Sequence, residues 1–261
     1  MSLVNFDSPK KAVGVITLND PESLNAMSLK MATEFKSLVE TLKAENKSFR
    51  ALIITGAGRA FSAGGDLEML LAKTKLSGEE NRLRMLEFYQ SFLCIRDLGI
   101  PLIAALNGHA IGAGLCLASG CDIRVASNKA KLGFTFSRLG LHPGMGATWF
   151  VPQLLGPARA GELLLTGRVI EAEEAYRIGM VSRLTKPEDT VTAALELAEE
   201  IGQCGPEATS QLLESLRTPQ PTIDQALQRE ALCQSINYAS EEFLDGVQAV
   251  KEKKTAKFAL K

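Results

Sequence analysis

Apolar residues of this chain gather into short runs of β-branched and other hydrophobic residues, separated by glycine-rich or polar stretches. Such runs predict buried strands, because these side chains pack well on a pleated surface. The clearest four are Val13–Leu18, Ala51–Thr55, Pro101–Leu106 and Asp122–Ser127. All four lie within the first 185 residues, so this part of the chain is predicted to contain a sheet.

Between the strand runs, apolar residues recur at helical spacing. Four of them between Phe35 and Leu42 share one helix face, and Ser28 is placed to act as the N-cap of that helix. Further helices are expected at 157–165 and 171–178. Strands and helices therefore alternate, which is typical of an α/β domain.

After about residue 186 the pattern changes, because helical stretches at 187–201, 206–216 and 223–250 follow one another without a strand run. We therefore expect a core domain, 1–200, and a helical C-terminal unit, 201–261. The apolar side chains of the last stretch need burial that a tail of about 60 residues can hardly supply alone. This unit is expected to pack on the main domain or on another subunit.

Composition and charge narrow the range of partners. The 261 residues are 46% hydrophobic, enough to bury a sizeable core. Lysine plus arginine number 29 against 30 acidic residues, and the net charge of −1 gives no field that attracts nucleic acid or an anionic membrane. No apolar stretch reaches the roughly 20 residues of a membrane span, and no signal-peptide pattern is present. We expect a soluble, cytoplasmic protein that acts on a small molecule.

The cysteines and histidines argue against disulfide and metal chemistry. Five cysteines occur without a CxxC pair, and only two histidines are present to complete a metal site. An odd number of thiols without a secretory pattern fits a reducing compartment. We expect free thiols, no disulfide and no bound metal.

Two glycine-rich segments follow predicted strands, one at 56–67 and one at 107–123. In α/β folds ligands bind at such strand ends, where glycine lets the backbone approach and a following helix presents free N–H groups. Neither segment contains GK[ST] or GxGxxG, so a phosphate loop and a dinucleotide site are both disfavoured. Each segment alone also fits a tight turn. Together they fit an oxyanion hole, in which two N–H groups hold one oxygen.

The chain resembles the crotonase, or enoyl-CoA hydratase/isomerase, family along nearly its whole length. The resemblance is carried by ITLNDPESLNAM, RAFSAGGDL, PLIAALNGHAIGAGLCLASGCDIRVAS, LGFTFSRLGLHPGMGATWFVPQLLG and ELLLTGRVIEAEEAYRIGMVSRL. It implies an α/β fold, a crotonase-type spiral of ββα units with a helical C-terminal trimerisation domain, and so a homotrimer or a hexamer (dimer of trimers). It also implies an acyl-CoA thioester as the ligand, with coenzyme A as part of the substrate and no permanently bound cofactor.

The resemblance also implies the site residues. In the AGGD and IGAG motifs, the N–H groups of Gly65 and Ala113 would grip the thioester carbonyl. The backbone around Ala63 would lie near the CoA adenine, and Asp66 and Leu67 would begin the helix that borders the pocket. Asp66 itself is interpreted as a helix-start or salt-bridge residue, since an acid in the first helical turn is stabilising on its own.

Three positions depart from the family pattern. Hydratases of the family carry one glutamate where this chain has Cys116 and the other where it has Phe136. Some isomerases and a dehalogenase carry their carboxylate where this chain has Gly144. Each substitution removes a proton carrier that the addition of water to a double bond requires. The pattern therefore argues against ordinary hydratase activity.

Few other groups are candidates for proton transfer. Cys116 is either a buried thiol that fills the space of the glutamate or an acid–base group, and His142 is either a structural loop residue or a proton carrier. His109 is interpreted as packing or hydrogen-bonding beneath its loop. Residues 76–98, Tyr89 among them, border the substrate in relatives, and the sequence does not rank them.

Two functions of different classes remain open. The first is an enzyme that stabilises a thioester enolate in isomerisation, decarboxylation or weak hydration, with Gly65, Ala113, Cys116 and His142 as catalytic residues. Decarboxylation has the simplest requirement, because no general base is needed once the enolate is stabilised. The second is a non-catalytic acyl-CoA binding protein. RNA binding, as in certain relatives, is disfavoured by the near-neutral charge.

Overall fold

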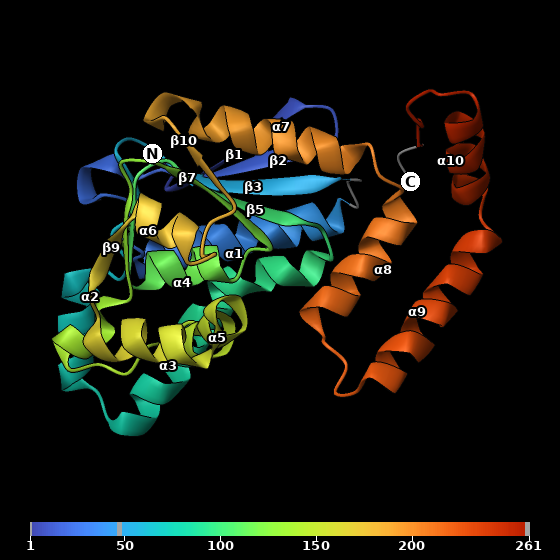
Figure 1. The fold of residues 1–261 in the computed structure, drawn as a ribbon. Helices are drawn as coiled ribbons and strands as arrows, with labels where there is room; N and C mark the ends of the chain where they lie inside the picture. Colours follow the sequence, from blue (N-terminus) through green and yellow to red (C-terminus); the bar gives the residue numbers. More distant parts are fainter. Residues whose placement is uncertain (1, 46–48, 259–261) are drawn as a thin grey trace.

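The computed structural model describes residues 2–45 and 49–258, and a six-stranded sheet of order β1-β2-β3-β5-β7-β10 forms its centre (Figure 1). Its strands are β1 (Val4–Lys10), β2 (Val13–Leu18), β3 (Ala51–Gly56), β5 (Leu102–Leu106), β7 (Ile123–Ser127) and β10 (Arg183–Thr185). β1 and β2 pair antiparallel, and all later neighbours pair parallel. The four strands predicted from the sequence are confirmed and lie next to one another in this sheet.

A second, smaller sheet has the order β4-β6-β8-β9. Its strands are β4 (Ala60–Ser62), β6 (His109–Ile111), β8 (Lys131–Gly133) and β9 (Val169–Glu171). Each of β3, β5 and β7 in the large sheet is followed by a short strand of the small sheet and then by helical structure. This repetition is the expected spiral of ββα units, and the predicted α/β fold is confirmed.

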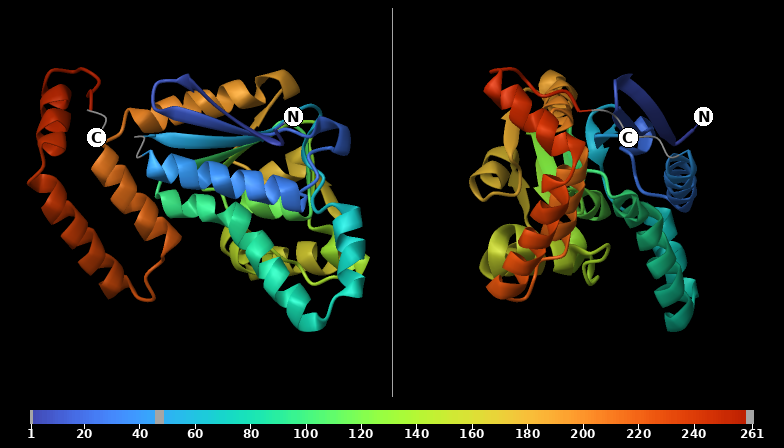
Figure 2. Two further views of the ribbon diagram at one scale, coloured as in Figure 1. Left: turned by 180° about the vertical axis from the view of Figure 1, so that it is seen from behind. Right: turned by 90° about the vertical axis from the view of Figure 1, so that its right-hand side faces the viewer.

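Helices cover both faces of the large sheet (Figures 1 and 2). On one face α1 (Leu29–Ala44), α3 (Gly78–Leu93) and α4 (Ala113–Ser119) enclose the larger apolar core. On the other face α7 (Thr190–Gly202) packs against a smaller core. α1 begins as predicted, because the hydroxyl of Ser28 accepts the hydrogen bond that caps its first turn.

Some of the remaining helices differ from the bounds expected from the sequence. The remaining helices are α2 (Leu67–Ala72), α5 (Ala147–Thr166), α6 (Ala172–Arg177), α8 (Pro206–Arg217), α9 (Ile223–Tyr238) and α10 (Glu241–Lys251). Short 3-10 turns lie at 21–23, 73–75, 94–98, 135–139 and 187–189. The helix expected at 157–165 is the second half of α5, which breaks at Gly156, where φ is +75°. The stretch 223–250 forms two helices, because Ser240 caps a new one by accepting from the Phe243 N–H. Among the described residues, no helix combines the length and apolar character that a membrane crossing requires.

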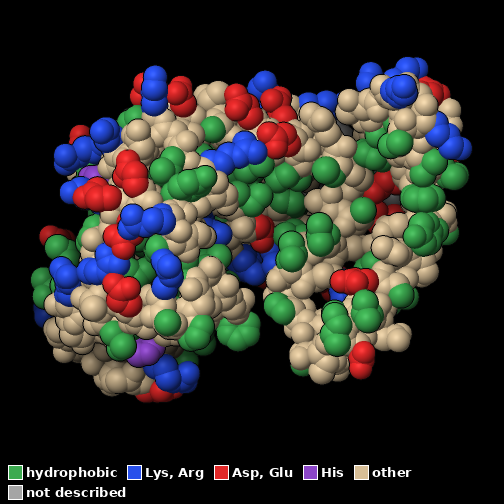
Figure 3. Space-filling model, viewed as in Figure 1, with side chains coloured by type: hydrophobic (Ala, Val, Ile, Leu, Met, Phe, Trp, Pro, Cys, Tyr) green, Lys and Arg blue, Asp and Glu red, His purple; other side chains and the backbone are tan. Residues whose placement is uncertain are grey.

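The helices α8, α9 and α10 extend away from the main body (Figures 1 and 2). α9 and α10 contain no buried residue, and α8 buries only Leu213. Large apolar side chains stay exposed on these helices, and Figure 3 shows hydrophobic side chains gathered over them. They include Leu212, Leu216, Ile223, Leu227, Leu232, Ile236, Tyr238, Leu244 and Val250. The main body therefore covers little of the apolar surface of this unit.

Arg217 attaches α8 to the body. Its guanidinium donates to both carboxylate oxygens of Asp122, at 2.9 and 2.6 Å, and to the carbonyl oxygens of Arg96 and Ile100. Asp122 also accepts from the backbone N–H of Leu102, the first residue of β5, at 2.8 Å. The attachment therefore lies at the amino ends of β5 and β7.

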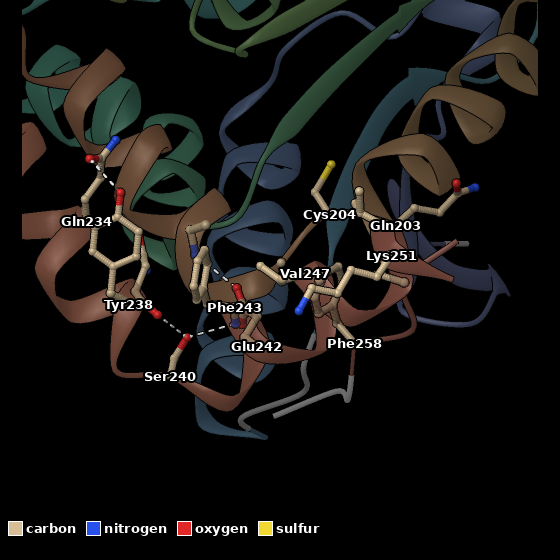
Figure 4. A pocket seen from close by; sticks show the side chains of 16 residues that line it. Gln203, Cys204, Gln234, Tyr238, Ser240, Glu242, Phe243, Val247, Lys251 and Phe258 are labelled. Carbon is tan, nitrogen blue, oxygen red and sulfur yellow. Dashed lines mark hydrogen bonds between the residues drawn. The ribbon is translucent and has the colours of Figure 1, made fainter. Parts of the chain in front are cut away.

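A hollow of about 720 Å³ lies inside the helical unit, between the end of α7 and helices α8 to α10 (Figure 4). At its wall, the Glu242 carboxylate accepts from the backbone N–H groups of Glu207 (3.2 Å) and Ala208 (3.3 Å), so a side chain of α10 caps α8. Tyr238 and Phe243 meet edge to face with ring centroids 5.1 Å apart. Neither glycine-rich segment reaches this hollow, which makes it a space within the helical unit rather than the candidate site.

Candidate active site

Backbone pairing fixes the direction of the Gly65 N–H. Met27 donates to the carbonyl oxygen of Gly64 (2.7 Å) and accepts from the N–H of Asp66 (3.4 Å), which makes a parallel bridge centred on Gly65. In such a bridge the N–H of the central residue points to the opposite side. No acceptor for it occurs among the described residues. The Gly65 N–H is therefore free to bind a ligand.

The second glycine-rich segment brings Ala113 to the same place. Ala113 is the first residue of α4, where a backbone N–H has no partner within the helix, and no described residue accepts from it. Gly112 enters the helix at a φ of +52°, which favours glycine. A Cβ on Gly64 would stand 2.6 Å from the carbonyl oxygen of Ile111 and 3.3 Å from the nitrogen of Ala113. The two segments are thus in direct contact.

Buried and half-buried side chains hold both segments in position. Ser62 donates to the carbonyl oxygen of Asn25 (2.8 Å) and accepts from the N–H of Gly64 (3.1 Å). The Asn25 amide donates to two backbone carbonyl oxygens of the first segment. The Asn107 side chain accepts from the N–H of Gly56 at the end of β3 (3.1 Å). The donors are therefore preorganised by satisfied polar groups.

Gly65 and Ala113 open into one cavity of about 470 Å³, a size typical of small-molecule sites. Five of the site residues assigned from the sequence line it, namely Ala63, Gly65, Leu67, Ala113 and His142. The rest of the lining is mainly apolar and comes from α2, α3 and the segment around η4 (Thr135–Leu139). The structure thus brings most of the assigned site together.

Asp66 and Cys116 stand outside the lining. The Asp66 carboxylate accepts from the N–H of Met69 at 2.7 Å and so caps α2, in agreement with its interpretation as a helix-start residue. Cys116 lies within α4 and is fully buried. Burial raises the pKa of its thiol, so the thiol is neutral at physiological pH.

The other two altered positions do line the cavity. The Phe136 ring lies against Gly112, with its terminal carbon 3.9 Å from the position of a Cβ there. Gly144 faces Tyr89, because a Cβ on residue 144 would overlap the Tyr89 hydroxyl and stand 2.7 Å from the ring carbon that bears it. Within the described part of the chain, the lining contains no aspartate and no glutamate.

The two histidines differ in position. His142 lies in the cavity lining, is exposed, and places its Nδ1 2.8 Å from the carbonyl oxygen of Pro143. His109 lies outside the lining, and its Nδ1 accepts from the backbone N–H of Lys131 at 3.1 Å. His109 therefore hydrogen-bonds beside its loop, as interpreted from the sequence.

Several polar residues of the lining were not singled out by the sequence. Lys73, Asn81 and Thr135 belong to it, and so does Tyr89, which carries the hydroxyl that the 76–98 stretch contributes to the described lining. Burial lowers the pKa of Lys73, and the nearby charge of Arg84 lowers it further. A helical pattern would have found part of this set.

That pattern lies on α3, where Phe88 and Tyr89 follow Met85 by three and four positions and all three residues line the cavity. Arg84 and Glu87 of the same helix are exposed and stand outside the lining. The helix period therefore separates Tyr89 from its charged neighbours.

Comparison with known proteins points to one family. The family model described as enoyl-CoA hydratase/isomerase matches residues 8–261. A probable enoyl-CoA hydratase of Mycobacterium tuberculosis is 41% identical over 191 residues, 73% of this chain and 72% of that protein. One of Mycobacterium leprae is 32% identical over 247 residues, 94% of each chain. The crystal structure of an enoyl-CoA hydratase from Bacillus anthracis matches with a TM-score of 0.91 at 32% identity, covering 99% of this chain and 100% of that one.

Proposed function

The chain belongs to the enoyl-CoA hydratase/isomerase family, and on that premise we propose that it removes carbon dioxide from a malonyl-type acyl-CoA thioester. The cavity lining carries the proposal. It offers the N–H groups of Gly65 and Ala113, which have no acceptor among the described residues, and it contains no described aspartate or glutamate. Such a site stabilises a negative oxygen but has no carboxylate to activate water.

Of the reactions considered, decarboxylation depends least on a general base. The bond between the α-carbon and the carboxylate breaks, its electron pair moves into the thioester carbonyl, and carbon dioxide leaves. The enolate oxygen that forms accepts hydrogen bonds from Gly65 and Ala113, which stabilise it more than they stabilise the starting carbonyl. One proton then adds to the α-carbon, so the product carries a C–H bond in place of the carboxylate.

The positive charge of Lys73 favours an anionic substrate. It contributes a positive charge to a lining without a described negative side chain. Its ammonium is partly desolvated, so a substrate carboxylate close to it would restore its favourable environment. We assign Cys116 to packing beneath the site, because its thiol is buried and neutral, and we keep His142 as a candidate proton carrier at the exposed side of the lining.

A substrate panel tests the proposal. Malonyl-CoA and methylmalonyl-CoA should lose carbon dioxide, and mass spectrometry should detect acetyl-CoA and propionyl-CoA. Succinyl-CoA is the matched control, because its carboxylate is one carbon too far for the departing electron pair to enter the thioester. Migration of the double bond in a 3-enoyl-CoA without release of carbon dioxide would contradict decarboxylation. Binding of all these thioesters without turnover would identify a non-catalytic binding protein.

We also propose that the chain assembles as a homotrimer or as a dimer of trimers. Support comes from α8, α9 and α10, which expose a long series of apolar side chains that one subunit leaves uncovered. Sedimentation velocity at micromolar concentration should therefore give a species of three or six chains. A single boundary at the 28.1 kDa of one chain would contradict the proposal.

A further inference from the structure

One polar side chain stands where the carboxylates of the family are missing. Tyr89 reaches from α3 to Gly144, so closely that any side chain on residue 144 would overlap its hydroxyl. The phenol of Tyr89 is therefore beside one of the three altered positions, Gly144, and it lines the cavity that holds Gly65 and Ala113.

The helix that carries Tyr89 is well fixed. Its first turn is closed by a reciprocal capping pair of Ser77 and Glu80, and Phe88 and Phe92 are buried in the main core. The Tyr89 ring also meets the Phe88 ring edge to face, with centroids 6.3 Å apart. These contacts hold the phenol ring at the cavity.

The Tyr89 hydroxyl has no hydrogen-bond partner among the described residues. A partly buried tyrosine hydroxyl usually finds one, so a ligand in the cavity is its natural partner. Burial raises the pKa of Tyr89, and Cys116 raises it further. The group therefore carries its proton at neutral pH, and it can donate but is not already ionised.

We propose that the Tyr89 phenol gives its proton to the α-carbon of the enolate held by Gly65 and Ala113. This role rests on the proposed decarboxylation. After carbon dioxide has left, the enolate electron pair forms the new C–H bond with the phenol proton, and the thioester carbonyl is restored. The phenolate then takes a proton from water, so each turnover consumes one proton from the solvent. Tyr89 thus replaces the missing carboxylates in the protonation step only.

The test compares the wild-type protein with Tyr89→Phe, using methylmalonyl-CoA in D₂O. With a single epimer of this thioester, loss of carbon dioxide leaves an enolate of one geometry, so the configuration of the deuterated propionyl-CoA reports the face of the final protonation. The wild type should give one enantiomer, as read by NMR of the derived propionate with a chiral reagent. Tyr89→Phe should give a mixture near one to one, because water then delivers the deuteron to both faces.

Two controls accompany this comparison. Tyr176→Phe removes the hydroxyl of an exposed tyrosine on α6, outside the cavity lining, and should keep the single enantiomer. The midpoint of thermal unfolding, followed by circular dichroism, should be the same for Tyr89→Phe and the wild type, which excludes a folding defect. A single enantiomer from Tyr89→Phe, or a mixture from the wild type, would overturn the role of Tyr89.

A separate outcome addresses the proposed function. If the wild type releases no carbon dioxide, decarboxylation is wrong, and deuterium exchange at the α-carbon of butyryl-CoA decides the role of Tyr89. The group that delivers a proton to an enolate also removes it in the reverse direction. Exchange by the wild type that falls about a hundredfold in Tyr89→Phe supports the assignment. Equal exchange by both proteins, or none by the wild type, rejects it.

Discussion

Crotonyl-CoA should be hydrated by this protein about ten-thousandfold more slowly than by an enoyl-CoA hydratase that carries both catalytic glutamates. General acid and general base assistance each contribute roughly a hundredfold or more, and the described lining of the cavity contains no aspartate or glutamate to supply either. Cys116 is buried and neutral, and Phe136 presents a ring to the cavity. The loss of absorbance of the conjugated thioester measures the rate.

A binding measurement distinguishes slow hydration by a folded protein from the inactivity of a defective preparation. A CoA thioester should still bind, because the N–H groups of Gly65 and Ala113 do not depend on the absent glutamates. Isothermal titration with butyryl-CoA supplies that control. A hydration rate constant within the ordinary enzyme range of about 1 to 1,000 per second would show that the catalytic groups are misplaced. His142, Tyr89 and Lys73 would then be the first residues to substitute.

The variant Ala113→Pro should lower the turnover of any productive thioester by about a hundred- to a thousandfold. Proline has no N–H, so this single change removes one of the two proposed oxyanion donors. The backbone tolerates it, because Ala113 is the first residue of α4, where proline is favoured in helices. Gly112 before it has φ +52° and ψ −122°, the mirror image of the extended region that a residue before proline prefers. Steady-state kinetics measures the loss.

A matched proline variant separates the loss of the N–H donor from the effect of proline on the backbone. Ala172 is likewise the first residue of a short helix, α6, and follows Glu171 in an extended conformation, outside the cavity lining. Ala172→Pro should keep both activity and thermal stability close to those of the wild type. Equal activity of Ala113→Pro and Ala172→Pro would remove Ala113 from the oxyanion hole.

The sequence predicts the parts of the fold whose signal is local. β2, β3, β5 and β7 are buried along most of their length, so their apolar runs are continuous and easily recognised. The cap at Ser28 is equally local, because its hydroxyl needs only the first turn of α1. Such features depend on neighbours in the chain.

Other elements depend on contacts that a single sequence hides. β4, β6, β8 and β9 have three residues each, too few to show an alternating pattern, and only pairing with one another defines them. The break of α5 at Gly156 has no recognisable signal in the sequence, because one glycine within an apolar stretch does not by itself indicate a positive φ. The spiral arrangement is predicted only through the family resemblance.

The candidate site likewise contains residues that the sequence identifies and residues that only tertiary contacts identify. Gly65 and Ala113 lie in motifs, so the sequence identifies them, and the structure places both at one cavity. Tyr89 reaches the cavity because α3 packs on α1 and turns one face inward, which is a tertiary relation. Its closeness to Gly144, some 55 positions later in the chain, has no trace in sequence spacing.

The Arg217 attachment and the candidate site lie at opposite ends of the parallel strands. The bonds of Arg217 lie at the amino ends of β5 and β7, whereas the glycine-rich segments leave the carboxyl ends of β3 and β5. About 16 Å of rigid strand separates the two ends. A side chain in the cavity can therefore be exchanged without disturbing the joint that carries the helical unit. Replacement of the lining residue Phe136 is such an exchange, because it changes the chemistry of the cavity and leaves the attachment of the helical unit unaltered.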